Sequence, residues 1–150
     1  MDIHLHHPDG HFRLRAAAII LRDDCLLAVR HAPTGSIYTI GGRVRMGEST
    51  ADAVRREVRE ETGQIIDIDR LLFVHEGFFT HAGKKHHEVC FFYLMQSPAT
   101  PIPDHTPTDQ PGEVLVWLPV NHLPDTPLVP AFLRTALQDL PLQIKHIISK

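Results

Sequence analysis

Residues 41–63 read GGRVRMGESTADAVRREVREETG and join a glycine loop to a segment rich in carboxylates. Gly41 and Gly42 carry no side chain, so the backbone can turn tightly there or approach a ligand closely. Ser49 is a favourable N-cap residue, and Gly63 suits the left-handed position just past a helix C-terminus. The stretch therefore predicts a glycine loop followed by a helix between Ser49 and Gly63.

The predicted helix carries an apolar stripe and an acidic face side by side. The apolar side chains that recur at helical spacing, and are expected to be buried, are Ala51, Val54 and Val58. Glu57, Glu60 and Glu61 stand at i, i+3 and i+4, so they share one face. Such a face is most often simply solvated. Here it adjoins the apolar stripe and follows two glycines and Glu48, and a patch of oxygen ligands in that setting suits Mg²⁺.

The stretch resembles the signature of the Nudix hydrolase family, G-x5-E-x7-R-E-U-x-E-E-x-G-U, in which U is an apolar residue. The resemblance runs from Gly42 to Gln64. The matching positions are Gly42, Glu48, Arg56, Glu57, Val58, Glu60, Glu61 and Gly63. Two positions depart from the pattern. Ile40 replaces a proline often found before the glycines, and Gln64 replaces the last apolar residue, a role for which the sequence offers Ile65.

This resemblance implies a hydrolase that requires a divalent cation, Mg²⁺ with Mn²⁺ as an alternative. Water would attack phosphorus and split a diphosphate linkage in a nucleoside diphosphate joined to another moiety, such as a nucleotide sugar, ADP-ribose or a nucleoside triphosphate. The implied metal ligands are Glu57, Glu60, Glu61 and the backbone carbonyl of Gly41. Arg56 and Glu48 would orient the site, and Gly41 and Gly42 would face the substrate.

Candidates for a general base lie both inside and outside the helix. Inside it, Glu57 and Glu61 are candidates. Outside it, Glu88 stands at the entrance of an apolar run and ranks ahead of Asp109 and Glu113, which flank the end of a long proline-rich loop. Tyr38 precedes the glycine loop and is a candidate for stacking on a base, although half-buried packing is the commoner role of such a tyrosine.

The rest of the chain predicts strands around this helix. The expected elements are a hairpin of 12–21 and 25–29, a short strand 37–40, an extended segment 65–75, a central strand 89–95, a strand 114–118 and a second helix from Pro130. Residues 142–148 suit either a last strand or a contact with a partner, so a homodimer is left open. Together with the resemblance, the pattern predicts an α+β fold, an α-β-α sandwich with a mixed β-sheet.

Length and composition favour one domain over residues 1–150. The net charge of −3 gives no basic footprint for nucleic acid, and no stretch is long enough to span a membrane. The two cysteines form no metal-binding spacing and indicate reduced thiols of a cytoplasmic protein. Residues 1–11 are expected to be a flexible terminus, with metal binding by their four histidines, or a short edge strand, as the alternatives.

Two other functions remain open from the sequence. One is a Nudix-fold module that binds nucleotides without catalysis, against which the complete carboxylate cluster argues. The other is hydrolysis of RNA caps or dinucleoside polyphosphates, and the absence of a basic stripe argues against an RNA substrate.

Overall fold

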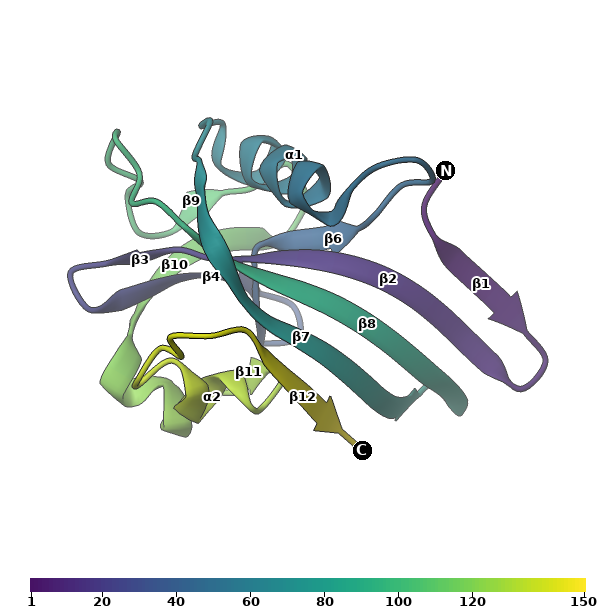
Figure 1. Ribbon diagram of the computed structural model, residues 1–150. Coiled ribbons are helices and arrows are strands. Elements are labelled where there is room, and N and C mark those ends of the chain that lie inside the picture. The colour runs from purple at the N-terminus through teal and green to yellow at the C-terminus, as the bar shows by residue number, and fades with distance from the viewer.

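Two six-stranded sheets form the middle of the molecule in the computed structural model, which describes residues 1–150 (Figure 1). The first sheet has the order β1-β2-β8-β7-β12, with β6 also paired to β2. Its strands are β1 (His4–His7), β2 (Gly10–Ile19), β6 (Gly41–Arg43), β7 (Ile68–His81), β8 (Lys84–Met95) and β12 (Lys145–Ser149). Parallel pairs (β2–β8 and β7–β12) and antiparallel pairs occur together, so the sheet is mixed.

The second sheet has the order β11-β5-β4-β10-β9, with β3 paired to β4. Its strands are β3 (Leu21–Arg22), β4 (Cys25–His31), β5 (Ser36–Thr39), β9 (Thr106–Pro107), β10 (Glu113–Pro119) and β11 (Leu128–Val129). The helical elements are α1 (Thr50–Thr62), the 3₁₀ helix η1 (Val120–Asp125) and α2 (Leu133–Ala136). None of these helices is both long and apolar enough to cross a membrane.

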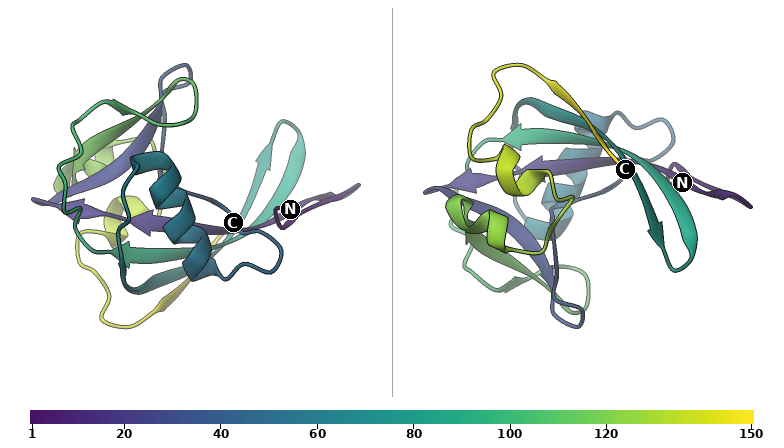
Figure 2. Two further views of the ribbon diagram at one scale, coloured as in Figure 1. Left: turned by 90° about the horizontal axis from the view of Figure 1, so that it is seen from above. Right: turned by 90° about the horizontal axis from the view of Figure 1, so that it is seen from below.

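Helices cover the sheets from opposite sides, and each side has its own core. The two views of Figure 2 show α1 on one side and α2 with η1 on the other. Side chains of β2 alternate between the cores: Ala16 and Ala18 pack with Val54 of α1, whereas Ile19 packs with Leu133 of α2. This layering confirms the predicted α-β-α sandwich, although one expected sheet is in fact two.

The predicted hairpin of 12–21 and 25–29 is wrong for most of its length. Only residues 21–22 pair with the start of β4, while β2 runs parallel to β8 in the other sheet. Residues 16–20 are all fully buried or nearly so. A strand covered on both faces needs neighbours on both edges to satisfy its backbone groups, and β8 and β6 provide them.

Local signals predicted the limits of α1 correctly. The Ser49 hydroxyl oxygen accepts a hydrogen bond from the Asp52 N–H (3.0 Å), and Gly63 ends the helix at a φ of 73°. The buried stripe contains Ala53 rather than the expected Ala51. The apolar residue that packs behind the helix is Ile66, not Ile65, whose exposure is 82%.

The structure resolves what the sequence left open at both ends of the chain. Residues 4–7 form the edge strand β1 on β2, not a flexible terminus, because four consecutive residues pair in register with β2. Residues 145–149 form the edge strand β12, parallel to β7. The second helix begins at Leu133 instead of Pro130, since the N–H groups of Leu133 and Arg134 bond carbonyls only three residues back, as in a turn.

Candidate active site

The glycine loop lies directly against α1. Gly41 and Gly42 form part of β6, opposite Ala17 and Ala16 of β2. The Gly41 N–H donates a hydrogen bond to Glu61 Oε1 (3.4 Å). A Cβ atom on Gly42 would lie 2.6 Å from Oε2 of Glu57, which is too close for any side chain. The two glycines thus bring the backbone up to Glu57 and Glu61, two of the three carboxylates that the resemblance implied as metal ligands.

Alanine at these two glycines is expected to have different effects. Gly42→Ala meets only side-chain atoms of Glu57 and no backbone, so we expect a smaller loss of melting temperature than for Gly41→Ala but a 10- to 100-fold loss of turnover, on the order that misplaced groups cost. Gly41→Ala meets the backbone of Ala17, 2.7 Å from its Cα, and should destabilise the fold by about 1–3 kcal/mol. Thermal melts and turnover of both variants check this, and equal destabilisation by both would contradict it.

Burial makes two of the helix carboxylates unusual. Burial, together with the neighbouring charge of Glu57, raises the pKa of the Glu61 carboxyl to about 8. Burial also raises the pKa of Glu57, although Arg56 opposes that shift. Glu61 Oε2 is buried and has no hydrogen-bond partner. A buried oxygen without a donor, beside a second carboxylate, is a set of ligand atoms that fits a hard divalent cation.

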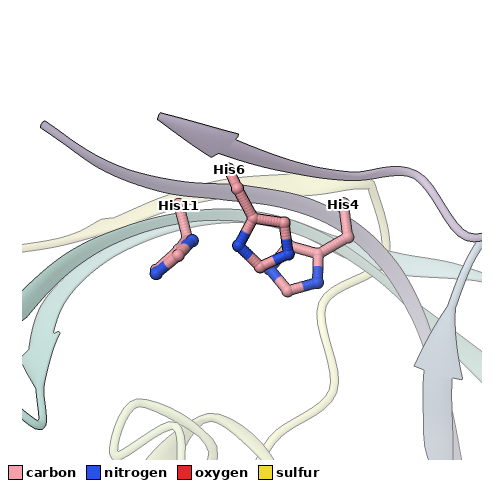
Figure 3. Close-up of side chains that lie close together, drawn as sticks. All are labelled: His4, His6 and His11. Atoms are coloured by element: carbon pink, nitrogen blue, oxygen red, sulfur yellow. The ribbon is translucent and has the colours of Figure 1, made fainter. Parts of the chain in front are cut away.

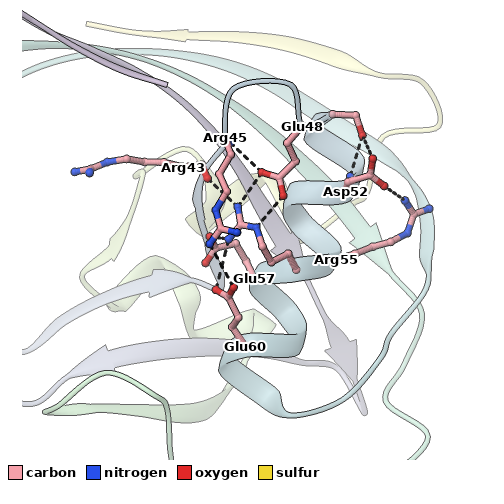
Figure 4. A network of polar contacts seen from close by, with 9 residues as sticks. Arg43, Arg45, Glu48, Asp52, Arg55, Glu57 and Glu60 are labelled. Carbon is pink, nitrogen blue, oxygen red and sulfur yellow. Dashed lines mark hydrogen bonds and ion pairs between the residues drawn. The ribbon is translucent and has the colours of Figure 1, made fainter. Parts of the chain in front are cut away.

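Arg56 links the carboxylates around it, and Figure 4 shows Glu48, Glu57 and Glu60 pointing toward a shared group of arginine nitrogens. Its Nε and Nη2 donate to the two oxygens of Glu48 (2.8 and 2.9 Å), its Nη1 donates to Glu57 Oε1 (2.6 Å), and Nη2 also reaches the Arg43 carbonyl (3.1 Å). The hydrogen bonds from Arg56 lower the pKa of Glu48 to about 2, so Glu48 stays charged. The sequence analysis assigned Arg56 and Glu48 to orienting the site, but it did not anticipate the bond from Arg56 to Glu57.

Glu60 lies at the rim of this group. Its side chain is 40% exposed, and it forms ion pairs with Arg56 (3.5 Å) and Arg45 (3.8 Å). In Figure 4 its carboxylate points toward the same arginine nitrogens as that of Glu57. Glu60 is therefore near the two buried carboxylates but is more open to solvent and more fully paired than Glu61.

Glu88 lies on β8 and is paired with arginines of a neighbouring strand. It is 7% exposed and is ion-paired with Arg13 and with Arg15 (3.6 Å) on the adjacent strand β2. Arg15 is within electrostatic reach of both Glu88 and Glu57. The expected position at the entrance of the central strand is wrong, because β8 begins at Lys84 and Glu88 lies inside it, where two guanidinium groups pair with its carboxylate.

The other two candidate bases approach α1 from the second sheet. Glu113 and Asp109 lie within electrostatic reach of Glu61. Burial and the charge of Glu57 are the larger causes of its raised pKa, and the charges of Glu113 and Asp109 add to it. Glu113 also accepts a hydrogen bond from the Tyr38 hydroxyl, and burial and that bond raise the pKa of Tyr38 above its usual range. Tyr38 is thus held on the same side of the molecule as the helix carboxylates.

A cleft of about 930 Å³ opens beside the glycine loop. Residues of both sheets line it, and its cationic side chains include Arg13, Arg15 and Arg43, none of which the sequence identified as site residues. The alternation of Arg13 and Arg15 along one strand was a usable signal, because residues two apart lie on the same face of a strand. Tyr38, Gly42 and Glu88 also line this cleft.

Comparison with known proteins agrees with this arrangement. The sequence model of the NUDIX domain family matches residues 11–140. A Streptomyces ambofaciens protein, "MutT-like protein", is 36% identical over 61 residues, 41% of this chain and 40% of that protein. A Caenorhabditis elegans protein with a nudix hydrolase name is 45% identical over 64 residues, 38% of this chain and 18% of that protein. The chain therefore spans less than half the length of these two relatives.

A solved structure is similar over nearly the whole chain. The crystal structure of a MutT NUDIX hydrolase from Burkholderia pseudomallei is 26% identical in sequence and has a TM-score of 0.56. The match covers 89% of this chain and 90% of that one. The similarity thus extends beyond the glycine loop and α1 to both sheets.

Proposed function

Because the chain belongs to the NUDIX domain family, we propose that it hydrolyses a diphosphate linkage in a nucleoside diphosphate joined to another moiety. The observation that best supports this is the pair of carboxylates facing the glycine loop, with Glu61 Oε2 buried and unpartnered. A buried carboxylate oxygen without a donor, such as Oε2 of Glu61, is costly to a fold, and a divalent cation is what would stabilise it. The free thiols of Cys25 and Cys90 agree with a cytoplasmic setting.

Glu57, Glu61 and Glu60, with the Gly41 carbonyl, are the groups that would hold Mg²⁺ or Mn²⁺. Such a cation, when bound, neutralises phosphate charge and lowers the pKa of coordinated water. Arg56 holds Glu57 by a 2.6 Å hydrogen bond and is itself held by Glu48, so these residues fix the direction of a ligand carboxylate.

The cleft supplies the charge and surface for the substrate. Arg13, Arg15 and Arg43 line it, and cations there attract the negative oxygens of a diphosphate. We propose that Glu88 holds Arg13 and Arg15 in place, since two ion pairs occupy its carboxylate. The same ion pairs disfavour Glu88 as general base. Glu57, Glu61, Asp109 and Glu113 remain the candidates for that role, since the last two lie within electrostatic reach of Glu61.

A hydrolysis screen with Mg²⁺ and with Mn²⁺ tests this function. It includes nucleotide sugars, ADP-ribose, deoxynucleoside triphosphates, dinucleoside polyphosphates and capped RNA, with a chelator as the control. We expect turnover of at least one nucleoside diphosphate derivative that stops when the cation is removed. Tight nucleotide binding without any turnover would favour a binding module instead. Turnover of capped RNA alone would favour a decapping enzyme.

The raised pKa of Glu61 predicts a pH-dependent metal affinity. A carboxylate with a folded-state pKa of about 8 keeps its proton between pH 4.5 and 8, where the unfolded chain has lost it. In the absence of metal, its contribution to stability is therefore greatest at low pH and declines as pH rises toward 8. Since metal must displace this proton, we expect Mg²⁺ affinity to rise up to about tenfold per pH unit from pH 6 to 8, and then to level off.

Calorimetric titration with Mg²⁺ at pH 6, 7, 8 and 9 measures this dependence. Glu61→Gln is the control, because it cannot release a proton and should bind weakly with little dependence on pH. Equal wild-type affinities at pH 6 and pH 8 would contradict the expectation.

A further inference from the structure

Three histidines outside the candidate active site come together on the N-terminal hairpin. His4 and His6 are two residues apart on β1, so their side chains leave the same face of the strand. His11 on β2 is the direct cross-strand partner of His6. One ring nitrogen from each of the three lies within 4.8 Å of the other two. Figure 3 shows the three rings projecting to one side of the hairpin.

The imidazoles of this cluster are not used by the protein itself. None of the three side chains forms a hydrogen bond or an ion pair, and Nδ1 of His11 is buried without a partner. The ring centroids of His6 lie 4.1 Å from His4 and 4.5 Å from His11. Free imidazole nitrogens in a close group of three are uncommon in a fold unless something binds them, since buried polar atoms are normally satisfied.

From this geometry we propose that His4, His6 and His11 bind one Zn²⁺ ion, with solvent completing a four-coordinate site. Histidine nitrogens bind zinc at about 2.0–2.1 Å, so in a tetrahedral site two such atoms are about 3.3 Å apart. Side-chain rotation about χ1 and χ2 would have to bring the nitrogens from a spacing of up to 4.8 Å to that value. Neutral imidazole is the binding form and predominates above its usual pKa of about 6.5.

The donor atoms distinguish this site from the carboxylate site on α1. Three imidazole nitrogens suit borderline transition metals, whereas carboxylate oxygens suit Mg²⁺. The site joins β1 to β2, and β1 is otherwise an edge strand with mostly exposed side chains. Just before β1, the Ile3 N–H donates to the Val44 carbonyl, next to the glycine loop (2.7 Å). Bound zinc would therefore fix the N-terminal strand to the sheet that carries this loop. This structural role is separate from hydrolysis.

Neighbouring histidines provide a natural control. His7 lies on the opposite face of β1, and its ring accepts a hydrogen bond from the Asp9 N–H (3.2 Å). His86 lies 5.1 Å from His11 between ring centroids but stacks on Phe79, so we leave it outside the ligand set. The prediction thus excludes His7 by the face it occupies and His86 by its stacking on Phe79.

The test is a Zn²⁺ titration followed by calorimetry in excess Mg²⁺, which occupies the carboxylate site. We expect wild type and His7→Ala to bind one more equivalent of Zn²⁺ than His6→Ala and His11→Ala bind. Loss of one direct ligand should lower the Zn²⁺ affinity of this site at least about 100-fold. Even substitution of residues that only hydrogen-bond to metal ligands lowers metal affinity 10- to 100-fold. Zn²⁺ should also raise the melting temperature of wild type and His7→Ala, but not of His6→Ala.

Equal zinc stoichiometry and affinity in His6→Ala and wild type would overturn the proposal, as would an equal loss in His7→Ala. Circular dichroism of each variant without metal shows that it is folded. Magnesium-dependent turnover is measured in parallel and should be similar in all four proteins, so failure of the zinc site is distinguishable from failure of the proposed hydrolysis.

Discussion

Glutamine at Glu57 or Glu61 is expected to remove most of the turnover while leaving the metal-free fold as stable as wild type or slightly more stable. The two carboxylates are partly buried side by side against the glycine loop, and each has a raised pKa. Removing one charge relieves a repulsion of about 0.2–0.5 kcal/mol even in an exposed helix. It also removes a proposed metal ligand that is at the same time a candidate general base, so we expect losses of about 10²- to 10⁴-fold.

Thermal melts across a Mg²⁺ titration distinguish a loss of metal binding from an effect on folding. The cation binds only the folded site, so wild type should gain about 2.7 kcal/mol at 100 times its dissociation constant. The glutamine variants should lose most of that gain together with the turnover. Glu60→Gln is the matched control, since Glu60 lies on the same helix face but is 40% exposed and should have the smaller effect. Parallel stability curves for all four proteins would refute a metal site on this helix.

Alanine at Arg56 is expected to be the most destabilising single change in the candidate site. It leaves Glu48 and Glu57, which are 16% and 15% exposed, without their shared counter-charge. Removing one partner of a fully buried ion pair costs about 3–5 kcal/mol, and we expect about 2–3 kcal/mol for these partly exposed groups. Turnover should fall as well, because Glu57 is no longer held. Arg56→Lys should recover only part of both, since lysine cannot make the two parallel bonds to Glu48.

Urea denaturation of Arg56→Ala and Arg55→Ala checks this expectation. Arg55 is the neighbouring residue, half exposed, with a single 3.3 Å ion pair to Asp52, and its loss should change stability by less than about 0.5 kcal/mol. The depressed pKa of Glu48 adds a pH signature. Its stabilising contribution is full above pH 4.5 and is lost as pH falls toward 2, and this acid sensitivity should disappear in Arg56→Ala. Equal effects of the two alanine variants would contradict the expectation.

Zinc at the N-terminal hairpin and magnesium at α1 are independent expectations. The hairpin site depends on nitrogen ligands from β1 and β2, and the helix site on oxygen ligands beside β6. Each can be removed by substitution without touching the other. A molecule that holds both would bind two metals of different chemistry in one small fold.

Local sequence was sufficient for the helix and for the identity of its acidic residues. The capping of α1 by Ser49 and its end at Gly63 depend on groups within a few residues of each other, so short-range chemistry decides them. The spacing of Glu57, Glu60 and Glu61 likewise decides that they share a face. The family resemblance extended this to a fold class, which the layered sheets confirm.

Other features depend on contacts between segments far apart in the chain, and only the tertiary structure decides them. Glu88 pairs with Arg13 across 75 residues, and Tyr38 reaches Glu113 across another 75. The sequence predicted that residues 12–21 would form a hairpin with residues 25–29. In the structure β2 instead runs parallel to β8, because β2 is buried on both faces. The sequence alone gives every carboxylate the same chemical identity. Whether it becomes a base, a metal ligand or an anchor for arginines depends on which charges and how much water the fold places around it.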